Sequence, residues 1–302
     1  MNMRFKKLTI KALSISALAI VIAGCGTDSD TPENNNTDTT KQIDQNKSQL
    51  LEIDGQLFSI PSPVQTALLI KEVGANFNGE MLNSPKNSTN YSTNFKKAVN
   101  LGVYGADLGY VTIYDQTQDA ITYLTAIKTV GDELGVSSAF DLELVERFEK
   151  NIGNQDSLLS LVSDAYRASD RYLKNNEQND IGGLILAGGW IESLYFATNA
   201  AKMTKNQEII RRIGEQKNTL NNLIKLLTPY YSKPEFSELI DGLMEINEIF
   251  NNVEFTYTYV EPTTDENSRT TTINSTTEVK ISDEQLQNIT DKIEQLRNKI
   301  IG

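Results

Sequence analysis

IGGLILAGGWIESLYFATNAA, residues 181–201, is the most apolar run downstream of the N-terminal segment, and Glu192 is its only charged residue. A helix that is apolar on all sides is buried, either in a protein core or in a membrane. Small residues and one leucine recur three and four positions apart, which places small groups on a stripe that a neighbouring helix can approach closely. The members of this stripe are Gly182, Leu186, Gly189, Ser193 and Ala197.

The length of this run, about 20 residues, is enough to span a bilayer. Glu192 lies near its middle, however, and a charge at that depth of a membrane is costly. We therefore favour a buried helix of a soluble domain over a membrane span. Each glycine in a helix interior costs about 0.8–1 kcal/mol relative to alanine. The helix is expected to break near Gly188 and Gly189 unless close packing offsets that cost.

A second glycine-rich helix is predicted between residues 92 and 114, because Gly102, Gly105, Ala106 and Gly109 share one stripe. This stripe is a natural partner for the one on residues 181–201. A site where a ligand approaches the glycine backbone is the alternative. Other residues of this helix could line a pocket or lie at the rim of the core. These are Asn100, Tyr104, Asp107, Tyr110 and Tyr114.

The hydrophobic periodicity of the chain predicts a mainly α fold with closely packed, glycine-rich central helices. A single domain is expected over residues 51–302. It begins with a short strand or turn over 51–60, and a loop over 75–91 follows the first helix. The expected helices cover residues 63–74, 92–114, 117–134, 140–152, 156–173, 181–201, 206–227, 232–250 and 282–302.

The residue pattern of the C-terminal part of the chain changes from helical to strand-like at Val253. In EFTYTYV, residues 254–260, aromatic residues alternate with threonines, which is typical of a strand. The threonine-rich run 269–281 completes a predicted β-hairpin over residues 253–281. Ser282 and Gln285 form a capping box that opens the terminal helix, and Ser232 with Glu235 forms another for the helix before the hairpin. The terminal helix carries a narrow apolar seam, which predicts docking on one neighbour helix: Leu286, Ile289, Ile293, Leu296 and Ile300.

The N-terminal segment has the three parts of a secretory signal: basic residues, a short apolar stretch and a cleavage site. Ile22-Ala23-Gly24-Cys25 closely resembles a bacterial lipobox, in which the cysteine is acylated after cleavage. An ordinary signal peptide with an incidental cysteine is the alternative. We therefore expect a signal peptide over 1–24, lipidation at Cys25, and a polar, disordered tether over 25–50. Gly26 after the cysteine favours the outer membrane as the location.

Charge and composition narrow the classes of function. Without the four cations of the signal, 24 Lys and Arg stand against 40 Asp and Glu, a charge of −16. Such an acidic body argues against nucleic-acid binding and against adhesion to anionic lipid, so the lipid on Cys25 has to provide the attachment to the membrane. The chain has no histidine, which removes the commonest general base and the commonest metal ligand. Hydrolases that use carboxylates alone remain open.

No motif for a cofactor or a metal occurs in the chain. Glycine-rich phosphate loops, GxSxG and HExxH are all missing. Asp115 and Asp119 could offer oxygen ligands to calcium, but the Asp-x-Asp-x-Asp-Gly loop is absent. Acidic residues at the start of a helix are usual for reasons of the helix dipole. We therefore expect no metal and no cofactor.

Glu192 is the best single candidate for chemistry. A carboxylate on a buried helix has a raised pKa unless it is paired, and perturbed groups mark functional sites. Arg167 and Arg171, on the preceding predicted helix, are candidate partners, and a structural ion pair is the competing interpretation. Trp190, the only tryptophan, lies beside it as a core residue or a ligand platform.

Five segments of the chain together resemble a set of predicted bacterial lipoproteins typical of Bacteroidota, a family without an assigned activity. The resemblance covers nearly everything after the tether and implies a mostly helical cell-envelope protein, with no catalytic or binding residues to carry over. The segments are 60–63 (IPSP), 100–110 (NLGVYGADLGY), 139–141 (AFD), 188–195 (GGWIESLY) and 270–279 (TTTINSTTEV).

The expected function is that of a lipid-anchored, non-catalytic protein of the outer membrane that binds a partner protein or a small ligand. The alternative is a carboxylate-dependent hydrolase that acts on envelope polymers through Glu192 or Asp107. Two carboxylates that face each other across an open cleft would favour the hydrolase. A sealed Glu192 paired to an arginine would remove that version of it.

Overall fold

The computed structural model describes residues 49–53, 56–60, 63–136, 178–265 and 270–302, together with a few positions between 146 and 164. All of them belong to the unit Gln42–Gly302. The predicted signal peptide, Cys25 and most of the tether lie outside the described residues. The same holds for the bounds of the helices predicted over 140–152 and 156–173, and for Arg167 and Arg171.

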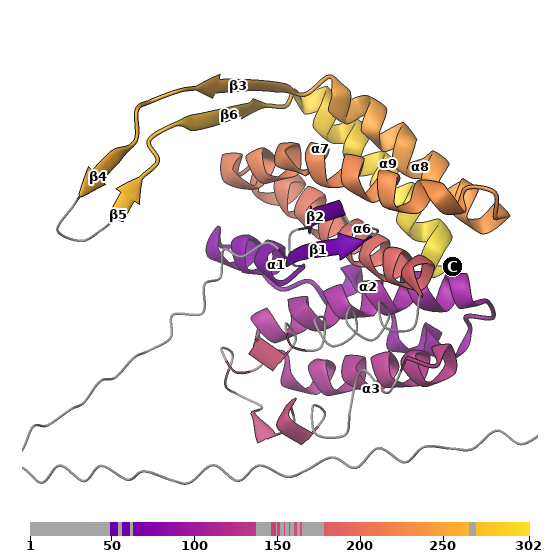
Figure 1. The fold of residues 1–302 in the computed structure, drawn as a ribbon. Coiled ribbons are helices and arrows are strands. Elements are labelled where there is room, and N and C mark those ends of the chain that lie inside the picture. Colours follow the sequence, from indigo (N-terminus) through magenta and orange to yellow (C-terminus); the bar gives the residue numbers. More distant parts are fainter. Residues whose placement is uncertain are drawn as a thin grey trace, which may run out of the picture. The chain divides into compact units, whose positions relative to one another are not determined.

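The described residues form a mainly α fold, as predicted, with strand pairs at both ends of the unit (Figure 1). Six of the predicted helices are found within a few residues of their expected bounds, and the terminal helix is found as well. The helices are α1 (Pro63–Glu72), α2 (Asn94–Ile113), α3 (Thr117–Leu134), α6 (Asn179–Thr204), α7 (Gln207–Leu227), α8 (Pro234–Asn251) and α9 (Asp283–Ile301).

The two glycine-rich helices, α2 and α6, lie against each other at the centre of the unit, as predicted. A Cβ on Gly102 would stand 1.9 Å from the carbonyl oxygen of Ile185, and one on Gly188 would stand 1.8 Å from that of Val99. The two backbones are therefore in direct contact, and this packing offsets the cost of the glycines. α6 runs without a break through Gly188.

The contact uses the predicted stripe of α6 only in part, through Gly189. Ile185, Gly188 and Gly189 approach α2, whereas Gly183 faces the side chain of Leu227 on α7. On α2, Gly102 makes the close approach, but Gly109 faces Val64 of α1. The small residues of α6 point to more than one side because the helix has neighbours on several sides, and these are α1, α2, α7 and α9.

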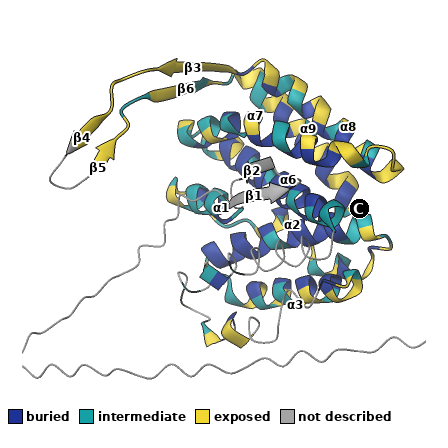
Figure 2. Ribbon diagram, in the orientation of Figure 1, coloured by how far each residue is buried: buried dark blue, intermediate teal, exposed yellow. Residues whose placement is uncertain are grey.

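α6 is long and apolar enough to cross a membrane by composition alone, with a mean hydropathy of 1.2 over its best window. Within the unit, however, 78% of that window is buried by protein. Its burial by four other helices agrees with the predicted buried helix. Figure 2 shows α6 mostly dark blue, between helices whose outer faces are teal and yellow.

Several helix ends follow the predicted local signals. Ser282 and Gln285 form both bonds of a capping box at α9, and α3 ends at Gly135, whose φ of 77° is in the left-handed region. The capping box predicted at Ser232 is wrong. α8 begins at Pro234 with Lys233 in the N-cap position and no side-chain cap. Proline at the first helical position has no N–H to satisfy, so this start of the helix needs less capping.

The N-terminal strands β1 (Gln49–Ile53) and β2 (Gln56–Ile60) form an antiparallel pair. The predicted C-terminal hairpin is present as two successive antiparallel pairs. β3 (Glu254–Thr258) pairs with β6 (Thr276–Lys280), and β4 (Thr263–Asp265) pairs with β5 (Thr270–Thr272). We call residues 254–265 and 270–280 the arm. Figures 1 and 2 show it leading away from the helices, with nearly all of its ribbon coloured as exposed.

The terminal helix α9 docks on two helices, α6 and α8, and its end also touches α2. The prediction of one neighbour helix is therefore wrong. The apolar seam is buried as expected through Ile289, Ile293, Leu296 and Ile300. Arg297 adjoins this seam and is also buried, which brings a charge into the centre of the unit.

Candidate functional site

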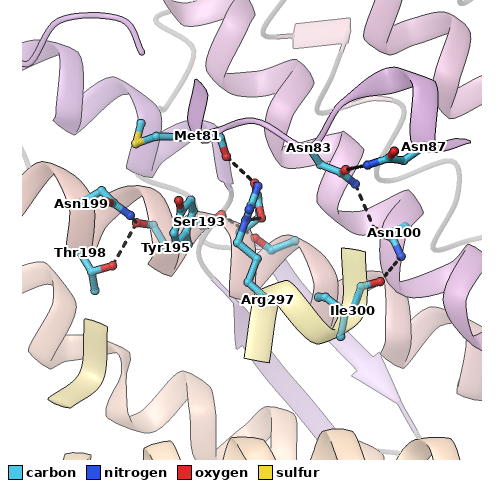
Figure 3. A network of polar contacts seen from close by, with 12 residues as sticks. Met81, Asn83, Asn87, Asn100, Ser193, Tyr195, Thr198, Asn199, Arg297 and Ile300 are labelled. Carbon is cyan, nitrogen blue, oxygen red and sulfur yellow. Dashed lines mark hydrogen bonds and ion pairs between the residues drawn. The ribbon is translucent and has the colours of Figure 1, made fainter. Parts of the chain in front are cut away.

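The centre of the unit holds a buried ion pair between Glu192 of α6 and Arg297 of α9. Nε of Arg297 donates to Oε2 of Glu192 at 2.6 Å, and Nη2 donates to Oε1 at 2.6 Å. Nη2 also donates to the backbone carbonyl of Met81 at 2.6 Å (Figure 3). The side chain of Glu192 is fully buried, and that of Arg297 is 6% exposed. This is a bidentate pair with its remaining bonding capacity partly satisfied by backbone.

The guanidinium of Arg297 also lies over the ring of Tyr195, with its central carbon 4.3 Å from the ring centroid. Burial opposes the charge of Arg297, but its bonds to Glu192 hold its pKa above the ordinary value. Glu192 is paired with Arg297 of α9, whereas the predicted partners Arg167 and Arg171 lie outside the described residues. Arg297 lies four residues after Ile293, on the buried side of α9, and this position in the apolar seam is the signal that could have identified it.

Asp107 of α2 lies beside this pair and is completely buried. Burial and then the negative charge of Glu192 raise the pKa of Asp107 well above its ordinary value of 3.8. Its two oxygens accept no hydrogen bond from any residue that the structure describes. As a neutral acid it avoids most of the cost of burying an unpaired carboxylate.

The negative charges of two adjacent buried carboxylates repel, so the surroundings disfavour ionisation of both. Burial raises the pKa of Glu192 too, but Arg297 counteracts this rise, so Asp107 is the carboxyl that holds a proton. The cluster of Asp107, Glu192 and Arg297 then carries no net charge. A neutral cluster avoids most of the cost of burying an uncompensated charge.

A network of amides continues from this cluster along α2. Nδ2 of Asn100 donates to the carbonyl of Ile300 at 2.7 Å, and its Oδ1 accepts from Asn83 at 3.2 Å. Asn83 in turn bonds to Tyr91 and Asn87, both at 2.9 Å. Figure 3 shows Asn87, Asn83, Asn100 and Ile300 in sequence, so the loop before α2 is tied to the end of α9.

Two buried tyrosines and one half-buried tyrosine hold the backbone of the same loop, residues 75–91. The hydroxyl of Tyr104 donates to the carbonyl of Ser84 at 3.0 Å, and that of Tyr123 donates to Asn83 at 3.0 Å. Tyr114 donates to the carbonyl of Ala75 at 2.7 Å. Burial raises the pKa of each of these three phenols, which keeps them neutral donors. The loop is thus fixed from inside by side chains of α2 and α3.

Of the predicted pocket residues on α2, Tyr110 is a core residue as well. Its hydroxyl accepts from the backbone N–H of Asn78 at 3.2 Å, and its ring packs on Phe196 with centroids 4.8 Å apart. Asn100, Tyr104, Asp107 and Tyr110 are all fully buried. They do not line an open pocket, and the glycines between them serve the helix contact rather than a ligand.

This geometry does not fit a hydrolase that acts through Glu192 or Asp107. Both carboxyls are fully buried, Glu192 is bound to an arginine, and the two acids adjoin each other instead of facing across a cleft. A pair of glycosidase carboxyls needs room for a sugar between them, about 5 Å or more. The cluster is suited to holding together α2, α6, α9 and the loop at Met81.

Trp190 lies apart from this cluster, in a pocket of about 410 Å³ between α1, α6 and α7. Its indole Nε1 donates to Oε1 of Gln216 at 3.1 Å, and the residue is 4% exposed. The floor is apolar and the rim is polar, with Arg212 and Glu215 joined at 3.2 Å. The volume lies within the range of small-molecule sites. Its apolar lining residues are Leu68, Leu69, Leu194, Ala197, Ile209 and Ile213.

No cluster of three or more potential metal ligands occurs among the described residues. Asp115, one of the two candidate calcium ligands, instead forms an ion pair with Lys71, whose Nζ lies 3.0 Å from Oδ2 of Asp115. Asp119 lies in the first turn of α3, where an acidic residue complements the helix dipole.

The arm is a second candidate site of interaction, besides the pocket at Trp190. Across the described chain, eight large hydrophobic residues are exposed, and five of them lie on the arm. Monomeric soluble proteins rarely expose such a group together, which makes the arm a candidate surface for an interaction. The five are Phe255, Tyr257, Tyr259, Val260 and Ile273.

Comparison with protein-family models, with curated proteins and with solved structures finds no match for this chain.

Proposed function

We propose that this chain is a lipid-anchored protein of the bacterial cell envelope that binds a partner protein through its arm and performs no catalysis. The lipobox at Cys25 supports the anchor, and the acidic body leaves the lipid as its means of attachment to the outer membrane. The exposed arm is the observation that carries the binding function. Tyr257 is 63% exposed, Tyr259 is 68% exposed and Ile273 is 78% exposed.

The physical reason is that an isolated two-stranded ribbon is only marginally stable in water. An exposed strand edge with apolar side chains is also a hazard, because it pairs readily with other chains. Tyrosine is enriched in protein interfaces, since it gives a large contact area and a polar tip. Selective binding of a partner to the arm resolves both the marginal stability and the exposed edge.

The test is site-specific photocrosslinking in intact cells of the source bacterium. A photoreactive residue at Thr258, on the arm, is compared with one at Met203, which is 56% exposed at the end of α6. We expect one defined envelope protein to be captured from Thr258 and not from Met203. The captured protein, once purified, should bind the wild-type chain and lose affinity for Tyr257→Ser/Tyr259→Ser. Equal capture from both positions, or equal affinity for the two chains, would refute the proposal.

A second candidate function is the binding of a small amphipathic ligand in the pocket at Trp190. The apolar floor and polar rim of that pocket favour it. Trp190 is the only tryptophan, so tryptophan fluorescence reports on this pocket alone. We expect envelope-derived small molecules that bind to shift the emission of the wild-type chain. A shift that persists after Ala197→Phe fills the pocket with a ring that is not a tryptophan would argue against binding there.

A further inference from the structure

The edge of β3 is the part of the arm that is open to another chain. Within the described residues, β3 pairs only with β6, in a sheet of two strands. In a two-stranded antiparallel pair, half of the backbone N–H and C=O groups of each strand point away from the partner strand. At the base of the arm β6 is held against α7, whereas β3 is the outer strand in Figure 1. An extended segment of another protein can add to that outer edge.

The two faces of the β3–β6 pair differ in chemistry. Phe255 lies opposite Val279, and Tyr257 lies opposite Thr277, so one face carries the aromatic rings. At the base of the arm this face is covered by α7. Nζ of Lys217 lies 5.6 Å from the centroid of Phe255, and Val279 packs on Gly214. Farther along, nothing in the described chain covers Tyr257, which leaves a ready contact for the apolar side chains of an added strand.

The opposite face carries an excess of negative charge. Glu254 lies opposite Lys280, and Glu278 lies opposite Thr256. Lys280 also approaches Glu278 at 3.8 Å, so this face of the pair carries two carboxylates and one ammonium group. Opposite charges on neighbouring strands are favourable and like charges are unfavourable. A second copy of this acidic chain is therefore a poor occupant, and a basic segment is a good one.

We infer that the arm binds an extended segment of alternating apolar and basic residues, which adds as a third strand along the outer edge of β3. This inference rests on the proposed function and defines the chemistry of its partner. The apolar residues of the segment contact Tyr257 and its neighbours on one face. Its Lys or Arg residues lie on the other face, next to Glu254 of β3 and about 10 Å from Glu278 of β6, because the side chains of a strand alternate between faces.

The experiment uses two synthetic peptides and the full chain. In the first peptide Val alternates with Lys, and in the second Glu replaces every Lys. We expect the Lys peptide to bind at least tenfold more tightly than the Glu peptide and to weaken as salt is added. On binding, the backbone amides of β3 should become protected from hydrogen exchange, because the added strand accepts their hydrogen bonds.

Charge reversal supplies the matched variants. Glu254→Lys/Glu278→Lys should weaken binding of the Lys peptide about tenfold, since one carboxylate next to the added strand and a second about 10 Å away both change sign. Glu238→Lys on α8 changes an exposed carboxylate away from the arm, next to Lys299 at 3.4 Å, and should leave binding unchanged. Circular dichroism confirms that each variant is folded.

Three results would overturn the inference: equal affinity for both peptides, binding without protection of β3, or concentration-dependent self-association of the chain through the arm. Crosslinking of an envelope partner from Thr258 with no binding of either peptide would overturn this strand-addition mode alone and leave the proposed function standing. Loss of the crosslink from Thr258 together with tight binding of the Lys peptide would overturn the proposed function and leave the strand-addition mode standing.

Discussion

Removal of Arg297 is predicted to be among the most damaging single changes in the protein. Arg297→Met keeps most of the side-chain volume but deletes three hydrogen bonds of 2.6 Å, two to Glu192 and one to the carbonyl of Met81. Glu192 then stays fully buried as an uncompensated charge beside Asp107. Breaking a buried pair in this way costs about 3–5 kcal/mol. A typical domain has only about 5–15 kcal/mol of stability in total.

A matched double variant separates the cost of an unpaired buried charge from the cost of altered packing. In Glu192→Met/Arg297→Met neither charge remains, so the main loss is the unbonded carbonyl of Met81, at about 1–3 kcal/mol. The double variant should therefore be more stable than Arg297→Met alone. Lys299→Met serves as the control, because Lys299 lies on the same helix with its side chain 63% exposed. Its stability should stay within about 0.5 kcal/mol of the wild type.

Urea denaturation of the purified variants, followed by far-ultraviolet circular dichroism, measures these differences as free energies of unfolding. The reasoning depends on the pair being buried and on Glu192 being ionised. It would be refuted if Arg297→Met lost less than about 1 kcal/mol, or if the double variant were as unstable as the sum of the two single changes.

Three further predictions concern other parts of the chain. The raised pKa of Asp107 keeps it protonated in the folded state at pH values where the unfolded state loses the proton. The free energy of unfolding of the wild type should therefore fall relative to that of Asp107→Asn as pH rises from about 4 through the raised pKa. Urea denaturation at several pH values checks this, and a difference between the two proteins that stayed constant with pH would contradict it. Gly102→Ala drives a methyl group into the carbonyl of Ile185 and should destabilise the fold by about 3 kcal/mol or more. In the control Gly79→Ala the new Cβ meets only the ring of Phe77, at 3.4 Å, and the loss should be about 1 kcal/mol or less. Thermal melting measures both changes. Cys25→Ala should abolish incorporation of labelled palmitate, and label that persisted would exclude the anchor.

Local features of the fold could be predicted from the sequence because they depend on residues a few positions apart. The capping box of Ser282 and Gln285 and the glycine end of α3 at Gly135 are examples. The burial of α6 also followed from its composition, since an apolar helix with one central charge has to lie inside protein or lipid. The alternation of Phe255, Tyr257 and Tyr259 predicted the strand that became β3.

The same local rules failed where the outcome depended on neighbours. Ser232 has the spacing of a capping residue, yet the helix begins at Pro234 without a side-chain cap. The small residues of α6 predicted one smooth stripe, but its glycines face both α2 and α7. Periodicity shows which residues of a helix are small, whereas the positions of the neighbouring helices decide which of those residues make the contact.

Glu192 shows the division between sequence and tertiary structure most clearly. A lone carboxylate in the run 181–201 was enough to predict a buried, perturbed group, because no nearby residue in the run could neutralise it. Its partner, Arg297, lies 105 residues away, and its neighbour Asp107 comes from a third helix. Pairing across such separations depends on how the helices pack. Hydrophobic burial and close backbone contact determine that packing, and a local sequence pattern does not show it. Only the tertiary structure could therefore decide that this acid is paired at the centre of the fold and that the arm is the part of the described chain where most of the exposed large hydrophobic residues lie.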